Sequence, residues 1–178
     1  MNLPNTLSLC RILIAALFTL FMSIHSSWAP VAAVTCFIVA SLTDWLDGYL
    51  ARKMNLVTDL GKLLDPLADK ILVAAAFVCF TEKGLCPAWA TVAILFREFA
   101  VTGLRLLLVE KQVVLPADQW GKWKTILQML YCIIVLAMLA GVAPIPDAIT
   151  TMLLYAVVGI TLWSGTNYFI KALPKLQD

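Results

Sequence analysis

The sequence predicts an all-α membrane protein with six transmembrane helices, and two observations lead to this fold class. The 178 residues are 62% hydrophobic and only 13% charged, which leaves too little polar surface to coat a soluble globule. The apolar residues also gather in segments close to the roughly 20 residues that a bilayer-spanning helix needs. Since only short connections separate these segments, we expect a single domain over residues 1–178.

The six expected spans are separated by polar or turn-rich pieces at residues 25–27, 51–62, 81–86, 110–124 and 142–147. Pro144 and Pro146 mark the last of these pieces. The spans themselves are residues 7–24, 29–46, 64–80, 87–109, 125–141 and 148–170.

The first apolar run also resembles a signal peptide, because Ser27-Trp28-Ala29 is similar to a small-residue cleavage site. However, Pro30 follows directly, and Arg11 is the one basic residue before the run ends. We therefore expect this run to be the first transmembrane helix.

The distribution of Lys and Arg predicts the orientation. With both termini in the cytoplasm, the outer side receives only Lys83, and the other twelve basic residues face inward. The connection at residues 51–62 then lies on the cytoplasmic side. The net charge of +2, without a basic stripe outside the membrane flanks, argues against a nucleic-acid partner.

Four carboxylates gather where the second span ends and the third begins. Asp44 and Asp47 are three residues apart, and Asp65 and Asp69 are four apart, so on helices each pair shares a face. Gly61 lies one turn before Asp65, which leaves the helix surface bare for another group to approach. Four such acids would repel one another unless a cation lay between them.

Oxygen ligands alone favour a hard cation such as Mg²⁺ or Mn²⁺, completed by substrate phosphates. Four acids are enough for two ions, which would stabilise the attacking and leaving oxygens of a displacement at phosphorus. The alternatives are charged helix ends without a ligand and an ion-transport site in a cation transporter.

The spacing of these acids belongs to a longer pattern, Asp44-x2-Asp47-Gly48-x2-Ala51-Arg52-x8-Gly61-x3-Asp65-x3-Asp69. It resembles the signature of the CDP-alcohol phosphatidyltransferases, and eight fixed positions make chance agreement improbable. The resemblance implies six transmembrane helices, usually in a homodimer, and transfer of a phosphatidyl group from a CDP-linked lipid to an alcohol with release of CMP.

The resemblance also implies roles for individual residues. Asp44, Asp47 and Asp65 correspond to metal ligands, and Asp69 to a residue that contributes to the metal site and acts as general base. The positions beside the CDP group are Gly48, Ala51 and Arg52, with Gly61 on the adjacent helix. Two small residues permit close approach of a nucleotide, and the Arg52 guanidinium offers donors to phosphate oxygens.

Residues at the start of the chain and in the second connection resemble further nucleotide-pocket positions. Asn5 and Ser8, followed by Arg11, are similar to the family's usual start, and Thr58 to a position near the nucleotide. Asn5 is equally suited to capping the first helix. For Arg52, the alternative is anchoring at the cytoplasmic face.

The signature leaves the acceptor alcohol open. Two segments, residues 97–105 and 121–125, resemble the phosphatidylglycerophosphate synthase branch, whose acceptor is sn-glycerol 3-phosphate. We expect its phosphate to be bound by cations, namely Arg97, Arg105, Lys122 and Lys124. Alternatively, Arg97 pairs with Glu98 or another acid and the lysines anchor the helix end.

The expected substrates are therefore CDP-diacylglycerol and sn-glycerol 3-phosphate, giving phosphatidylglycerol phosphate and CMP in phospholipid biosynthesis. Serine or an inositol phosphate remains an alternative acceptor. The expected location is the bacterial cytoplasmic (inner) membrane, with lipids around the helices and the active site on the cytoplasmic side. His25 lies on the opposite side in this topology and receives no role.

Overall fold

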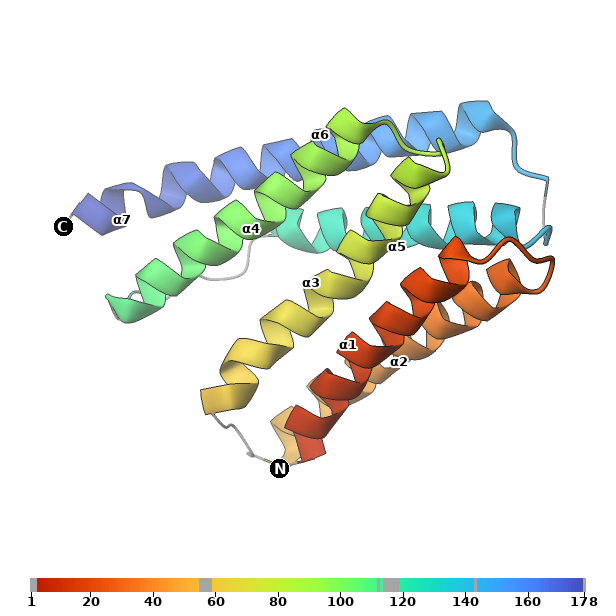
Figure 1. Ribbon diagram of the computed structural model, residues 1–178. Coiled ribbons are helices and arrows are strands. Elements are labelled where there is room, and N and C mark those ends of the chain that lie inside the picture. The colour runs from red at the N-terminus through yellow and green to blue at the C-terminus, as the bar shows by residue number, and fades with distance from the viewer. Residues whose placement is uncertain (1–2, 55–58, 112, 114–118, 143, 178) are drawn as a thin grey trace. The chain divides into compact units, whose positions relative to one another are not determined.

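A computed structural model describes residues 3–54, 59–111, 113, 119–142 and 144–177, apart from the side chains of 3–5, 7, 44–54, 59–67, 69 and 177. All regular structure in these ranges is helical, as the sequence predicts, and no strand occurs in them. The helices, drawn in Figure 1, are α1 (Leu3–Ser23), α2 (Ala29–Met54), α3 (Asp59–Glu82), α4 (Ala88–Glu110), α5 (Gln119–Leu139), α6 (Asp147–Ala172) and the short α7 (Pro174–Gln177).

Each expected span corresponds to one of the six long helices, but several ends were placed wrongly. The connection expected at residues 51–62 is shorter, because α2 continues to Met54 and α3 begins at Asp59. The connection expected at 110–124 is also shorter, since α5 begins at Gln119. Hydropathy marks only the apolar part of a helix, whereas backbone hydrogen bonds continue it through polar residues.

The described chain forms two compact units, Met1–Lys83 with Val135–Pro144, and Gly84–Ile134 with Ile145–Asp178. In the first unit, α1 packs against both α2 and α3. Phe18 of α1 and Phe37 of α2 meet with ring centroids 5.9 Å apart. The core around them is rich in alanine, and small residues let membrane helices approach closely. These buried alanines are Ala15, Ala29, Ala33, Ala40, Ala68 and Ala76.

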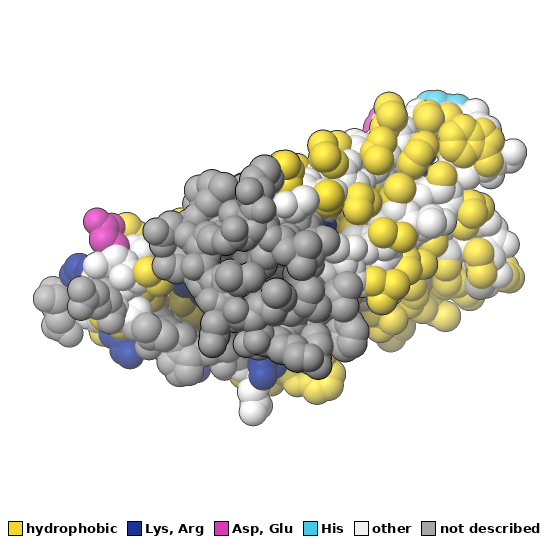
Figure 2. Space-filling view, turned by 90° about the horizontal axis from the view of Figure 1, so that it is seen from below, with side chains coloured by type: hydrophobic (Ala, Val, Ile, Leu, Met, Phe, Trp, Pro, Cys, Tyr) yellow, Lys and Arg dark blue, Asp and Glu magenta, His cyan; other side chains and the backbone are white. Residues whose placement is uncertain are grey.

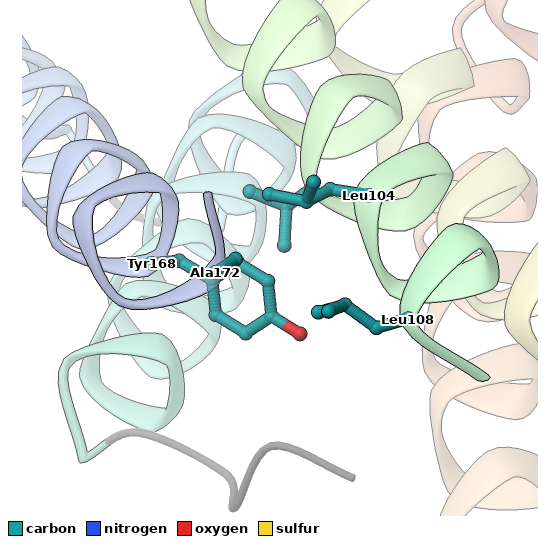
Figure 3. Packing of buried hydrophobic residues seen from close by; sticks show 5 residues of the cluster. Leu104, Leu108, Tyr168 and Ala172 are labelled. Atoms are coloured by element: carbon teal, nitrogen blue, oxygen red, sulfur yellow. The ribbon is translucent and has the colours of Figure 1, made fainter. Parts of the chain in front are cut away.

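The second unit contains the contact between α4 and α6. Figure 3 shows Leu104 and Leu108 of α4 facing Tyr168 and Ala172 of α6, and Val101 completes this buried cluster. Near the chain's end, the Nζ of Lys111 donates a 2.6 Å hydrogen bond to the carbonyl oxygen of Leu176. These contacts hold α6 and the start of α7 against α4.

The end of α5 shows how a glycine stops a helix. Gly141 has φ of 69°, and its N–H donates to the Met138 carbonyl at 3.1 Å. The next N–H, of Val142, donates to the Ala137 carbonyl at 3.0 Å. This pair of bonds is a Schellman motif, which satisfies carbonyls that the helix end would otherwise leave free.

Large apolar side chains are exposed on all six long helices. They include Phe96 and Phe99 on α4 and Met152 on α6, the last 76% exposed. Figure 2 shows many hydrophobic side chains on the described part of the surface that faces the viewer. A soluble monomer rarely exposes contiguous apolar surface of this kind, whereas lipid tails cover it without cost.

Two described helices, α5 and α6, are long and apolar enough to cross a bilayer. Shorter apolar stretches lie at Ser8–Ser23 and Ala29–Thr43. These helices support a membrane protein, while the number of six spans stays a prediction.

Candidate functional site

The helical backbone carries the four predicted metal-binding acids. Asp44 and Asp47 lie in α2, and Asp65 and Asp69 lie in α3. The side chains of these four residues lie outside the described part of the structure. Because the backbone is helical at these positions, Asp44 and Asp47 share one helix face, and so do Asp65 and Asp69.

The donor set of these positions consists of oxygen atoms alone, which fits a hard divalent cation. Among the described side chains no group of three or more His, Cys, Asp or Glu residues is placed to hold a metal. The four acids were not among those side chains, so the metal site remains a prediction.

The predicted nucleotide positions are described in part. Gly48, Ala51 and Arg52 lie in α2 and Gly61 lies in α3, where only the backbone is described. Thr58 lies outside the described residues. Their contacts with a nucleotide therefore remain predictions.

At the start of the chain, α1 carries the other predicted nucleotide residues. Asn5 lies inside the helix, so the capping role is wrong, because an N-cap residue precedes the helical turns. Ser8 is buried, and so is Arg11, which lies one turn later. Arg11, which counts among the basic residues expected on the cytoplasmic side, is only 3% exposed.

Three charged side chains of the second unit form a buried ion cluster, which consists of Arg97, Glu98 and Lys124. The Nη1 of Arg97 donates to Oε1 of Glu98 at 3.2 Å, and the Nζ of Lys124 donates to the same oxygen at 2.5 Å. The side chains of Arg97 and Glu98 are each 11% exposed, and that of Lys124 is 7% exposed. Anchoring at a helix end is therefore wrong for Lys124, whereas the pairing of Arg97 with Glu98 is confirmed.

The buried ion cluster joins residues from α4 and α5 that are 26 positions apart in the sequence. Arg97, Lys124 and Glu98 by themselves count two cations and one carboxylate. The buried Nε of Arg97 also has no hydrogen-bond partner among the described residues. Buried donors are normally satisfied, so this nitrogen is an exception among the described residues.

A glycine of α6 lies against Arg97. A Cβ atom built on Gly165 would come within 2.8 Å of the Arg97 Cγ, which is closer than real Cβ atoms approach. Only glycine therefore leaves room for the Arg97 side chain in this position.

The other two predicted acceptor cations are not part of the buried ion cluster. Arg105 is exposed, and its guanidinium carbon lies 5.8 Å from the centroid of the Tyr168 ring, which is a cation–π contact. Lys122 is exposed in the first turns of α5. The structure thus brings together Arg97 and Lys124 and gives Arg105 a different neighbour.

A layer of buried polar residues joins α5 to α6, with Gln128 one turn after Lys124 on α5 and Thr161 one turn before Gly165 on α6. The Nε2 of Gln128 donates to the Oγ1 of Thr161 at 3.3 Å, and the Oγ of Ser164 donates to the Thr161 carbonyl at 3.1 Å. These residues were not among the predicted site residues. The signal that could have found them is polar side chains inside apolar segments, which in membranes commonly join helices by hydrogen bonds.

Comparison with known proteins supports the resemblance over nearly the whole chain. A family model described as CDP-alcohol phosphatidyltransferase matches residues 1–163. A Bacillus subtilis protein is 42% identical over 191 residues, covering 99% of this chain and 97% of the relative. A Rickettsia felis protein is 37% identical, covering 98% and 96%, and a Pseudomonas fluorescens protein is 36% identical, covering 99% and 93%.

All three relatives bear the name CDP-diacylglycerol–glycerol-3-phosphate 3-phosphatidyltransferase. Both the extent of the family match and the identity over full-length relatives exceed what a shared motif alone would give. The chain belongs to the CDP-alcohol phosphatidyltransferase family.

Proposed function

We propose that this protein transfers the phosphatidyl group of CDP-diacylglycerol to sn-glycerol 3-phosphate, forming phosphatidylglycerol phosphate and CMP. Family membership supports phosphatidyl transfer and argues against a cation transporter. The names of the relatives support this acceptor. The product would enter phospholipid biosynthesis.

The observation that carries the acceptor assignment is the burial of Arg97 and Lys124. A serine acceptor brings no phosphate, whereas glycerol 3-phosphate and an inositol phosphate each bring a dianion that charged donors bind strongly. Between these two phosphorylated acceptors, the names of the relatives favour glycerol 3-phosphate. An ionisable residue buried in an apolar helix is costly and usually functional. We assign Arg97 and Lys124 to the acceptor phosphate, with Arg105 and Lys122 as further cations of the same subsite.

The reaction breaks the phosphoanhydride bond of CDP-diacylglycerol and forms a phosphoester bond to the acceptor. The primary hydroxyl oxygen of the acceptor bonds to the lipid-side phosphorus, and the bond from that phosphorus to CMP breaks. Asp69 accepts the hydroxyl proton, and Arg52 stabilises the negative charge on the departing CMP. Asn5, Ser8, Gly48, Ala51, Thr58 and Gly61 would line the nucleotide site.

Asp44, Asp47, Asp65 and Asp69 would together hold Mg²⁺ or Mn²⁺, most economically as two ions. A cation bound there would neutralise the acids and the pyrophosphate and stabilise charge at phosphorus. The oxygen-only donor set supports this assignment.

We further propose a single domain of six transmembrane helices in the bacterial inner membrane, with termini and active site in the cytoplasm. The distribution of Lys and Arg supports this topology. The family resemblance supports a homodimer.

The test is CMP release by the purified protein in mixed micelles with CDP-diacylglycerol and Mg²⁺. The panel compares sn-glycerol 3-phosphate, serine, inositol and inositol phosphate. Release with glycerol 3-phosphate alone is expected. Release with another acceptor would move the protein to another branch of the family, and no release from folded protein would overturn the enzymatic assignment.

A further inference from the structure

We propose that Glu98 and Gly165 are positioning residues that hold Arg97 and Lys124 in place for the phosphate of the acceptor. This inference rests on the proposed function, because it concerns how the acceptor subsite is built. Neither residue needs to touch the substrate. Glu98 acts through its carboxylate, and Gly165 acts through the space that its missing side chain leaves.

Glu98 fixes two cations with one oxygen atom. Arg97 and Lys124 both donate to Oε1, at 3.2 Å and 2.5 Å. Two cations buried this close together repel each other, and the carboxylate between them offsets that repulsion. The carboxylate thus lets α4 and α5 place two positive charges together.

Glu98 holds only one of the three nitrogens of the Arg97 guanidinium. One terminal nitrogen bonds Glu98, while the buried Nε has no hydrogen-bond partner among the described residues. A guanidinium presents its donors as a rigid planar fork, so fixing one nitrogen also fixes the direction of the others. Oriented donors of this kind are what a phosphate needs for a bidentate contact.

Gly165 sets the path of the Arg97 side chain from the opposite helix. The Arg97 Cγ lies where a Cβ of residue 165 would come within 2.8 Å, and its Nε and Cδ lie within 3.6 Å and 3.8 Å of that point. Any larger residue must displace the arginine stem. Gly159, on the same helix, has open space at the corresponding position.

The first experiment measures kcat and KM for Glu98→Gln and Glu98→Asp, using CMP release. Loss of one hydrogen bond to a charged group costs roughly a factor of ten or more, so we expect Glu98→Gln to raise the KM for glycerol 3-phosphate at least about tenfold. The KM for CDP-diacylglycerol should stay within about threefold of the parent value, because that substrate is bound elsewhere. Glu98→Asp keeps the charge and should recover part of the loss.

The second experiment separates positioning from folding. Gly165→Ala removes no charge but displaces Arg97, so it should raise the same KM, while the matched control Gly159→Ala should leave it unchanged. In the double variant Glu98→Gln with Lys124→Met, the two effects should not add, because Glu98 acts through Lys124. Stabilisation of each variant by glycerol 3-phosphate in a thermal unfolding assay gives a readout without turnover.

A parental KM for glycerol 3-phosphate in both Glu98→Gln and Gly165→Ala would overturn the inference. So would an equal loss in Gly165→Ala and Gly159→Ala, which would indicate a packing effect. If Glu98→Gln does not fold, Gly165→Ala decides the question alone. Failure of the parent protein to release CMP with glycerol 3-phosphate would instead overturn the proposed function.

Discussion

The acid segment (residues 44–69) and the buried ion cluster differ in how their charges are brought together. In the acid segment, like charges recur at helical spacing on α2 and α3, which are neighbours in the sequence. In the buried ion cluster, opposite charges meet from α4 and α5, with Gly165 of α6 beside Arg97. Local spacing builds the first region and tertiary packing builds the second, so we expect the first to carry the chemistry and the second to carry selection of the acceptor.

The largest expected effect is the loss of turnover in Asp69→Asn. A general base contributes roughly a factor of 10² to 10⁴, so kcat should fall by at least about a hundredfold while the protein stays folded. CMP release and size-exclusion chromatography measure the two properties. Asp147→Asn, at the exposed start of α6, is the matched control and should keep full activity. Near-normal turnover by Asp69→Asn would remove the acid segment from the chemistry.

Metal removal should also lower kcat by at least about a hundredfold. Chelation by EDTA followed by desalting should abolish CMP release, since four carboxylates without a cation repel both one another and the pyrophosphate. Added Mg²⁺ or Mn²⁺ should restore it. Full activity in the presence of excess chelator would contradict the metal assignment.

Arg97→Gln should change selection of the acceptor rather than chemistry. We expect the KM for glycerol 3-phosphate to rise by about tenfold or more, with kcat less affected. The fold should survive, because Lys124 still pairs with Glu98. Arg105→Gln, which loses a cation–π contact at an exposed site, should raise this KM by only about threefold or less. If Arg105→Gln has the larger effect, the acceptor subsite lies with Arg105 instead.

The smallest effect is on stability. Gln128→Leu leaves the buried hydroxyl of Thr161 without its side-chain donor, at a cost of about 1 kcal/mol in a membrane protein. The unfolding midpoint in detergent should therefore fall while both KM values stay unchanged. The double variant Gln128→Leu with Thr161→Val should recover part of the loss, and additive losses would show that the two side chains do not interact.

The sequence predicted the all-helical fold and each long helix, because bilayer-spanning segments need runs of apolar residues that can be read directly. It placed the helix ends less well. Met54, Asp59 and Gln119 lie at helix ends within polar sequence, where hydropathy carries no signal.

The acid segment was also readable, since helical spacing is a local property and family membership agrees with the pattern. The site residues themselves remain predictions. By contrast, nothing in the spacing of residues 97 to 165 indicated that Lys124 shares an oxygen of Glu98 with Arg97, or that Gly165 makes room for that arginine.

The sequence by itself thus determined that the protein belongs in a lipid bilayer, where its helices lie and which family it belongs to. Each of these depends on residue type and on the local period of the sequence. Only the tertiary structure decided which cations are buried and that Lys124 shares the Glu98 carboxylate with Arg97. Those outcomes depend on which helix faces meet. The sequence of an apolar span with one or two charges does not specify which of its faces will contact another helix.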